Sequence, residues 1–218
     1  MTIRIGRRTA LALTGAAALH GPARAQAKEI EIALLVPMTG PWAREGILER
    51  MGAEMAVDDV NNSGGIKSLG GAKLKLLIFD TQDTAEKAKD AAQRMLSEHP
   101  ALVGGIGCWL STFTLAATEV TERAQLPWLT LSYSDAITGR GFHFVFQTSP
   151  TAIKQAEDIV PIVMNLAQAT THKRPTKVAI IGDNTAASVS FLKPIRDHIL
   201  KDEKLTAVVD KIYTPPLA

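Results

Sequence analysis

The stretch of sequence that decides the fold is Ala101-Leu-Val-Gly-Gly-Ile-Gly-Cys-Trp-Leu-Ser-Thr-Phe-Thr-Leu-Ala-Ala-Thr-Glu-Val120. It begins with a short apolar run, 102–106, whose length and bulk predict a buried parallel strand. Glycines at positions 104, 105 and 107 allow a tight turn and a close approach of the backbone to a neighbour or ligand. A helical pattern follows, with Leu115, Val120 and Ala124 available for its inner side.

Ser111 and Thr112 stand where this helix is expected to begin. A hydroxyl at a helix start can accept a hydrogen bond from a free N–H group of the first turn. The same N–H groups, together with the positive end of the helix dipole, favour a bound carboxylate or phosphate. Ser111 is therefore either a helix cap or a ligand-binding residue, and the stretch alone does not decide between them.

The rest of the chain repeats this alternation of strand and helix. Further strands are expected at 29–37, 74–79, 127–132, 142–147, 178–181 and 206–212, and helices at about 47–61, 83–98, 152–169 and 188–201. This order predicts right-handed β-α-β units and a mostly parallel sheet, hence an α/β fold.

Two of the predicted helices carry details that a structure can test. The helix after the loop 39–46 offers Ile47, Met51, Met55 and Val57 for its inner face. The segment Asp83-Thr-Ala-Glu86 matches a capping box, which predicts Asp83 as the cap of the next helix.

Composition and charge describe a globular chain: 218 residues, 46% hydrophobic and 21% charged. The formal charge of +2 includes four arginines in an N-terminal segment that we expect to be removed. Without residues 1–27, 20 basic residues face 22 acidic ones, a net charge of −2. A mildly acidic chain has no reason to bind nucleic acid or an anionic membrane.

Residues 1–27 are typical of a signal peptide. Three arginines come before a largely apolar run, Ala10–Leu19, and the small-x-small sites Ala23-Arg-Ala25 and Ala25-Gln-Ala27 follow. Ten such residues are too few to cross the roughly 30 Å hydrocarbon core as a helix. We therefore predict an exported, soluble, periplasmic protein, with both general and twin-arginine export left open. The single cysteine, Cys108, lies far from the cleavage site and is expected to be a small buried hydrophobe.

The ligand site is expected in the loops at the carboxyl ends of the strands, as in other open parallel sheets. These loops are 39–46, 107–112, 132–140 and 182–188. They are rich in Ser, Thr and Trp and poor in His and in paired acids, which favours recognition over catalysis. We expect no enzymatic activity, no metal and no cofactor.

Several motifs in one order carry a resemblance to a known family. They are Pro37-Met-Thr-Gly-Pro-Trp-Ala43, Gly52-Ala-Glu-Met-Ala-Val-Asp-Asp-Val-Asn61, Gly64-Gly-Ile66, Ser111-Thr112, Thr114-Leu-Ala-Ala-Thr118 and Asp183-Asn-Thr-Ala186. Together they resemble the leucine/isoleucine/valine-binding family, the type I solute-binding proteins of ABC importers. The resemblance implies two Rossmann-like lobes that close on a ligand, here a first lobe at 28–148 and the beginning of a second at 149–218.

The resemblance also implies site residues and partners. Ser111, with its neighbour Thr112, would bind the α-carboxylate of an amino acid through hydroxyl and backbone N–H. Further contacts would come from the four residues of the loop after the fourth strand, from one side chain of the first loop and from one position of the second lobe: Ser132, Tyr133, Ser134 and Asp135; Trp42 or Glu45; and Ala187. The partners implied are a small carboxylate-bearing solute and a membrane permease.

The chain departs from the family pattern in two ways. Ala187 stands where amino-acid binders often carry a tyrosine, and Ser188 replaces the glycine after it, so binders of aromatic acids or amides stay open. Family members are nearly twice as long, so we expect this chain to be truncated in its second lobe. A ligand sensor of the same fold is a further alternative.

Other functions fit the residues less well. Gly105-Ile-Gly-Cys-Trp-Leu110 has only two of the three glycines of a dinucleotide-binding fingerprint. Ser111 lacks the Gly-x-Ser-x-Gly elbow of a hydrolase, and the scattered histidines have neither orienting acids nor metal-ligand spacing. Two site residues also have structural alternatives: Trp42 as a loop anchor, and Asp135 as the cap of a turn at 136–138.

Overall fold

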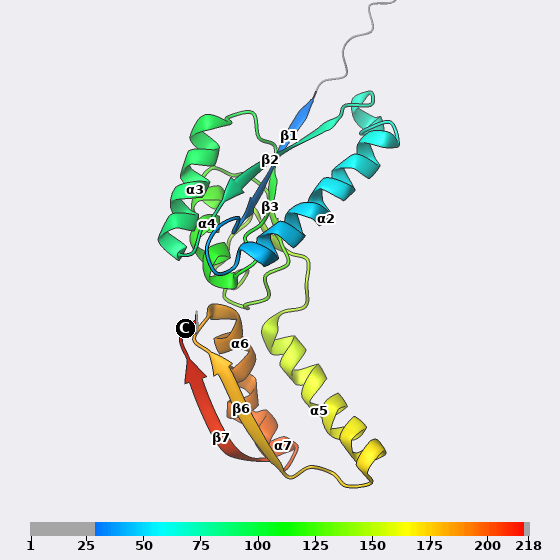
Figure 1. Cartoon of the computed structure of the whole chain (residues 1–218), viewed down its shortest axis with the longest axis vertical. Helices are drawn as coiled ribbons and strands as arrows, with labels where there is room; N and C mark the ends of the chain where they lie inside the picture. Colours follow the sequence, from blue (N-terminus) through cyan, green and yellow to red (C-terminus); the bar gives the residue numbers. More distant parts are fainter. Residues whose placement is uncertain (1–28, 216–218) are drawn as a thin grey trace, which may run out of the picture.

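The computed structural model describes residues 29–215 and arranges them as two bodies, one above the other in Figure 1. The predicted signal peptide lies outside the described residues. We use "first lobe" for residues 29–148 and "second lobe" for residues 149–215; the boundary between them stays a prediction. Among the described residues, no helix combines the length and the apolar character needed to cross a bilayer.

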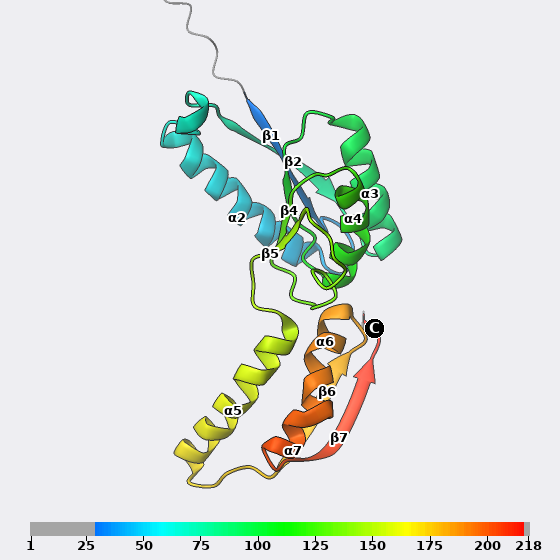
Figure 2. The same ribbon diagram turned by 180° about the vertical axis from the view of Figure 1, so that it is seen from behind.

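The first lobe is built on a five-stranded parallel sheet in the order β2-β1-β3-β4-β5. Its strands are β1 (Ile30–Val36), β2 (Leu74–Asp80), β3 (Gly105–Gly107), β4 (Trp128–Thr130) and β5 (Val145–Gln147). Helices α3 (Ala85–Glu98) and α4 (Ser111–Arg123) cover one face, and α2 (Ala43–Asn62) lies on the other (Figures 1 and 2). The predicted α/β fold with a parallel sheet is confirmed.

The core of this lobe lies between the sheet and the pair α3 and α4. Small and large side chains alternate in it: Ala33, Leu35, Ala88, Ala92, Met95, Phe113, Ala117 and Trp128. Trp128 is fully buried, and its ring packs on Gly105, where a Cβ atom would stand 2.2 Å from the ring. That contact needs a glycine at position 105. The strand itself is Gly105–Gly107 rather than the predicted 102–106.

Helix α2 contradicts the prediction about its inner face. Ile47, Met51 and Met55 are 44%, 53% and 67% exposed, and Gly46 is the one α2 residue that the structure buries fully. The helix comes closest to the sheet at Gly46, which sits directly against the carbonyl of Pro37. Three of the four predicted inner residues therefore face outward, and only Val57 is half-buried.

The ends of α3 and α4 also differ from the predictions. Thr84, not Asp83, caps α3: its side chain accepts from Lys87 N, while Asp83 forms an ion pair with Lys87 at 2.8 Å. The N-cap side chain bonds the N–H three residues on, which is Lys87 for Thr84 and would be Glu86 for Asp83, so α3 begins one residue later than the capping box predicts. In α4, Val120 is buried as predicted, but Ala124 is the exposed C-cap residue.

The second lobe contains α5 (Ala152–Thr171), β6 (Lys177–Asp183), α6 (Ala186–Pro194) and β7 (Thr206–Tyr213). A π-helical turn (Ile195–Ile199) and the short α7 (Leu200–Asp202) continue α6, so one helical segment reaches the predicted end near Lys201. β6 and β7 pair in parallel and point toward the first lobe (Figure 1). The core of this lobe is Ala156, Ile180, Leu192, Ile195 and Ile199.

Candidate functional site

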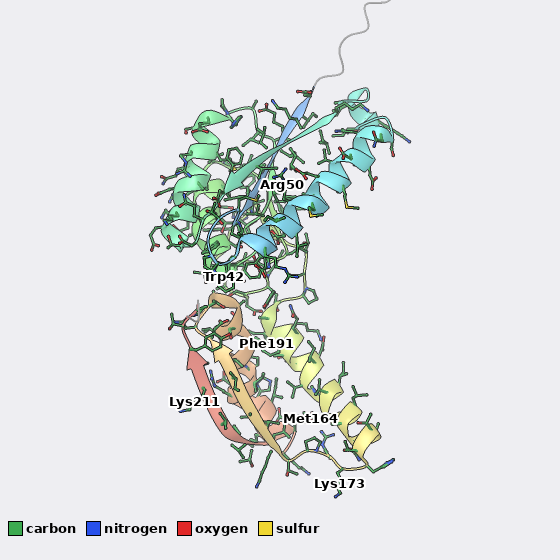
Figure 3. The ribbon with its side chains drawn as sticks, in the orientation of Figure 1. Trp42, Arg50, Met164, Lys173, Phe191 and Lys211 are labelled. Carbon is green, nitrogen blue, oxygen red and sulfur yellow. The ribbon has the colours of Figure 1, made fainter. Side chains whose placement is uncertain are left out.

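A cavity of ≈ 170 Å³ lies between the two lobes, where the carboxyl ends of the strands meet. Both lobes line it: Trp42, Trp109, Leu110, Ser111 and Tyr133 from the first, and Asp183, Thr185 and Ala187 from the second. Figure 3 shows Trp42 at the end of the first lobe that faces the second. Four residues predicted as site residues, namely Trp42, Ser111, Tyr133 and Ala187, are therefore brought to one cavity.

Ser111 is the first residue of α4 and is 2% exposed. The N-cap position belongs to Leu110, which has no side-chain oxygen, and the Ser111 hydroxyl accepts from the backbone N–H of Ser134 at 3.2 Å. The interpretation of Ser111 as a helix cap is therefore wrong. At a helix start the first N–H groups have no acceptor within the helix, so a ligand oxygen can take that place beside Ser111.

The start of α6 meets the start of α4 across the cavity. The Thr112 hydroxyl accepts from Ala186 N at 3.2 Å, and the hydroxyls of Ser134 and Ser190 lie 2.8 Å apart. Thr112 and Ser134 thus join the lobes directly. Because α4 and α6 both present their N-terminal ends here, the partial positive charges of two helices act on one small volume.

Ser132 has a supporting position. It is 1% exposed, its hydroxyl donates to the carbonyl of Trp109 at 2.7 Å, and it lies 2.6 Å from the Thr114 hydroxyl. These contacts place it behind the cavity wall, where it fixes the loop between β3 and α4. Its predicted contact with the ligand stays a prediction.

Asp135 and Glu45 are not among the residues that line the cavity. The Asp135 carboxylate accepts from Ile153 N at 3.0 Å, at the start of α5, rather than from the turn at 136–138. Glu45 is in the first turn of α2 and lines a neighbouring open depression together with Trp109 and Tyr133. A ligand contact by either acid stays a prediction.

The loop that carries Trp42 is fixed by Asp80, at the end of β2. Burial opposes the charged form of this carboxyl, but hydrogen bonds from Thr39 Oγ1 (2.6 Å), Gln82 N (2.7 Å) and Met38 N (2.8 Å) outweigh it and lower its pKa. An ionised Asp80 therefore holds the backbone just before Trp42.

Trp109, Leu110 and Asp183 lie in the expected site loops 107–112 and 182–188 but were not predicted as individual site residues. Asp183 ends β6, and its Oδ1 accepts from both the N–H and the hydroxyl of Thr185, so it shapes the start of α6. Asp183 follows the predicted strand 178–181, so the rule that ligands bind at the carboxyl ends of parallel strands is the signal that points to it. Nothing local in the sequence marks Trp109, which depends on the turn described below.

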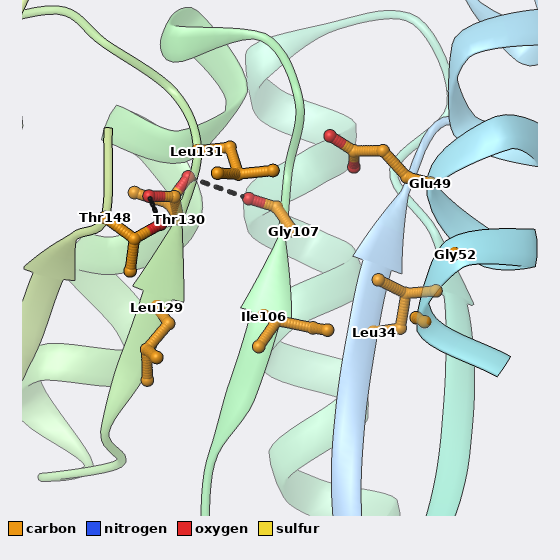
Figure 4. Close-up of a pocket in the computed structure, with 10 residues that line it drawn as sticks. Leu34, Glu49, Gly52, Ile106, Gly107, Leu129, Thr130, Leu131 and Thr148 are labelled. Atoms are coloured by element: carbon orange, nitrogen blue, oxygen red, sulfur yellow. Dashed lines mark hydrogen bonds between the residues drawn. The ribbon is translucent and has the colours of Figure 1, made fainter. Parts of the chain in front are cut away.

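A larger groove of ≈ 340 Å³ lies on the sheet face beside α2 (Figure 4). Its walls are apolar, and its hydroxyls are already bonded: Thr130 donates to Gly107 O at 2.9 Å and Thr148 to Thr130 O at 3.1 Å. Glu49 is the exception, since its buried Oε2 has no hydrogen-bond partner and burial raises its pKa to about 7. The groove offers no converging donors for an anion, so the cavity between the lobes is the better candidate.

Comparison with known proteins fits this geometry. A family model described as "Periplasmic binding protein" matches residues 29–218. The chain belongs to the periplasmic binding protein family. Relatives include Leu/Ile/Val-binding protein homolog 8 of Brucella abortus (32% identical over 191 residues, 85% of this chain and 45% of the relative) and homolog 7 of Brucella melitensis (31% over 206 residues, 93% and 50%).

Solved structures show that this periplasmic binding protein has the type I fold, as predicted. The substrate-binding protein LivJ of Streptococcus pneumoniae, in complex with isoleucine, superposes with a TM-score of 0.72 at 23% identity, covering 86% of this chain and 50% of LivJ. A solute-binding protein of Rhodopseudomonas palustris, in complex with 3,4-dihydroxybenzoic acid, gives 0.70 at 19% identity, covering 85% and 47%. The chain thus spans about half the length of the proteins it matches. Family and fold are those of solute-binding proteins, and the family implies an exported protein.

Proposed function

We propose that the protein is the periplasmic solute-binding component of an ABC importer and takes branched-chain or related amino acids. It binds its solute between the lobes and performs no bond-making chemistry. Lobe closure then presents a closed face to the membrane permease. The names of the Brucella relatives support the amino-acid assignment.

The observation that carries the proposal is the cavity at the starts of α4 and α6. Ser111 lines it from one lobe and Thr185 and Ala187 from the other. Two helix N-termini favour a carboxylate there, and this preference needs no cationic side chain. The described residues also contain no group of three or more His, Cys, Asp or Glu side chains arranged to hold a metal ion. The two helix starts thus support a carboxylate, and Asp183 adds one acidic side chain to the same cavity.

Ser111→Ala tests the proposal. Hydrogen bonds to a charged group contribute about 1.5–3 kcal/mol each, so the dissociation constant for the preferred amino acid should rise by roughly tenfold or more. Isothermal calorimetry with leucine, isoleucine and valine measures this change. Ser97→Ala, an exposed serine on α3 that bonds only to Arg94 O of its own helix, is the matched control and should leave the constant unchanged.

Folding of both variants is compared by thermal unfolding, because Ser111→Ala also frees the amide of Ser134. A normally folded Ser111→Ala protein with wild-type affinity would remove Ser111 from the site. A wild-type protein that binds no amino acid or other organic acid would contradict the proposed function itself.

A further inference from the structure

Trp109 lies in a turn that a tryptophan adopts only under constraint. Gly107, Cys108 and Trp109 have φ angles of 111°, 75° and 43°, all in the left-handed region. Glycine adopts such angles freely, whereas a bulky side chain there is a clear outlier. Residues of this kind persist where the surroundings over-determine them, and they cluster at ligand sites.

Two hydrogen bonds hold the turn on either side of the indole. Cys108 N donates to the carbonyl of Leu35 in β1, and the Trp109 carbonyl accepts from the buried hydroxyl of Ser132 at 2.7 Å. Cys108 itself is fully buried, so the turn cannot rotate as a unit. The fold therefore fixes Trp109 at the cavity instead of leaving its ring in solvent.

The Trp109 ring meets a second indole from a distant part of the chain. The ring centroids of Trp42 and Trp109 lie 5.2 Å apart at an angle of 46°. Tyr133, from the loop after β4, lines the same cavity. Three loops thus bring aromatic side chains to one cavity, which the start of α4 at Ser111 also lines.

We propose that Trp109 is a specificity residue that, with Trp42, forms an aromatic wall for the apolar body of a carboxylate ligand. The inference rests on the proposed function, since it assigns the carboxylate to the start of α4. The ligand class is then a small carboxylate whose remainder is branched-aliphatic or aromatic. Polar side chains of the same shape are rejected, because their amide groups would lose water against the rings without gaining partners.

Leucine and asparagine have similar shapes and differ in polarity. The ratio of their affinities therefore measures how strongly the aromatic wall favours an apolar side chain. The wild-type protein should bind leucine at least roughly tenfold more tightly than asparagine. Trp109→Ala should weaken leucine binding by roughly tenfold and leave asparagine binding unchanged, whereas Trp109→Phe should restore most of the ratio. 4-Hydroxybenzoate is titrated in parallel to tell an aromatic from an aliphatic preference within the class.

Trp109→Gly guards against a folding effect, since glycine accepts the φ of 43° without strain and also lacks the ring. It should give the same loss for leucine as Trp109→Ala. Indole emission adds a direct readout, because the third tryptophan, Trp128, is 0% exposed in the core. Ligand should change the emission of Trp42→Phe, and the change should disappear in the Trp42→Phe, Trp109→Phe double variant.

Equal weakening of leucine and asparagine by Trp109→Ala, or an unchanged ratio, would overturn the specificity role while leaving the proposed function intact. Failure of the wild-type protein to bind any carboxylate would overturn both.

Discussion

Gly46→Ala is expected to lower the free energy of unfolding of the first lobe by about 3 kcal/mol, at the upper end for an added methyl group. A Cβ atom at this position would stand 1.8 Å from the carbonyl oxygen of Pro37 and 2.6 Å from its carbon. Both are backbone atoms of the residue that follows β1, so rotating a side chain cannot relieve the contact. Denaturant unfolding followed by circular dichroism measures the loss.

Gly52→Ala on the same helix is the matched control. No atom lies within 4 Å of the Cβ that this substitution would add. Alanine is the better helix former, so this variant should be more stable by about 0.5–1 kcal/mol. If Gly46→Ala and Gly52→Ala changed the free energy of unfolding equally, the close contact between α2 and Pro37 would be contradicted.

The second large effect is a dependence of stability on pH that comes from Glu49. Burial raises the pKa of this carboxyl from 4.5 to about 7 in the folded protein. The folded state therefore holds the proton more tightly than the unfolded chain. The contribution of Glu49 is most favourable below pH 4.5, falls as the pH rises to about 7, and is constant above that. The total fall is on the order of 3 kcal/mol.

Glu49→Gln keeps the shape of the side chain and removes the titration. The free energy of unfolding, measured from pH 4.5 to 8, should decline more steeply in the wild-type protein than in this variant. Glu54→Gln is the control, since Glu54 lies on the same helix with its side chain 41% exposed and pairs with Arg50 at 2.7 Å. If the free energy of unfolding had the same pH dependence in the wild-type and Glu49→Gln proteins, the raised pKa of Glu49 would be contradicted. Water or a hydrogen-bond donor would then reach its Oε2 atom.

The order of elements in the fold could be predicted from local patterns. The apolar run 74–79 corresponds to β2, and the helical pattern predicted after Pro150 corresponds to α5. Both could be predicted because hydrophobic periodicity and turn residues depend on neighbours within a few positions of the sequence. The prediction of which face of α2 is buried was wrong, because local patterns do not report on contacts with distant residues. An apolar stripe indicates one face of the helix, but the contact of Gly46 with Pro37 decides which face approaches the sheet.

The candidate site was predicted in part. Trp42, Ser111, Tyr133 and Ala187 follow predicted strand ends, and the structure brings them to one cavity. Trp109 was missed because its position depends on a left-handed turn held by Leu35 and Ser132. Those partners stand 73 and 23 positions from the turn residues that they bind, Cys108 and Trp109.

The sequence by itself determined the alternation of strands and helices, the parallel sheet and the family, since each depends on short-range spacing and on residues in a fixed order. Only the tertiary structure decided that Ser132 supports Trp109, that the Asp135 carboxylate meets the start of α5, and that two indoles share one cavity. The physical reason is that such contacts form between distant loops, and their geometry is set by how helices and strands pack.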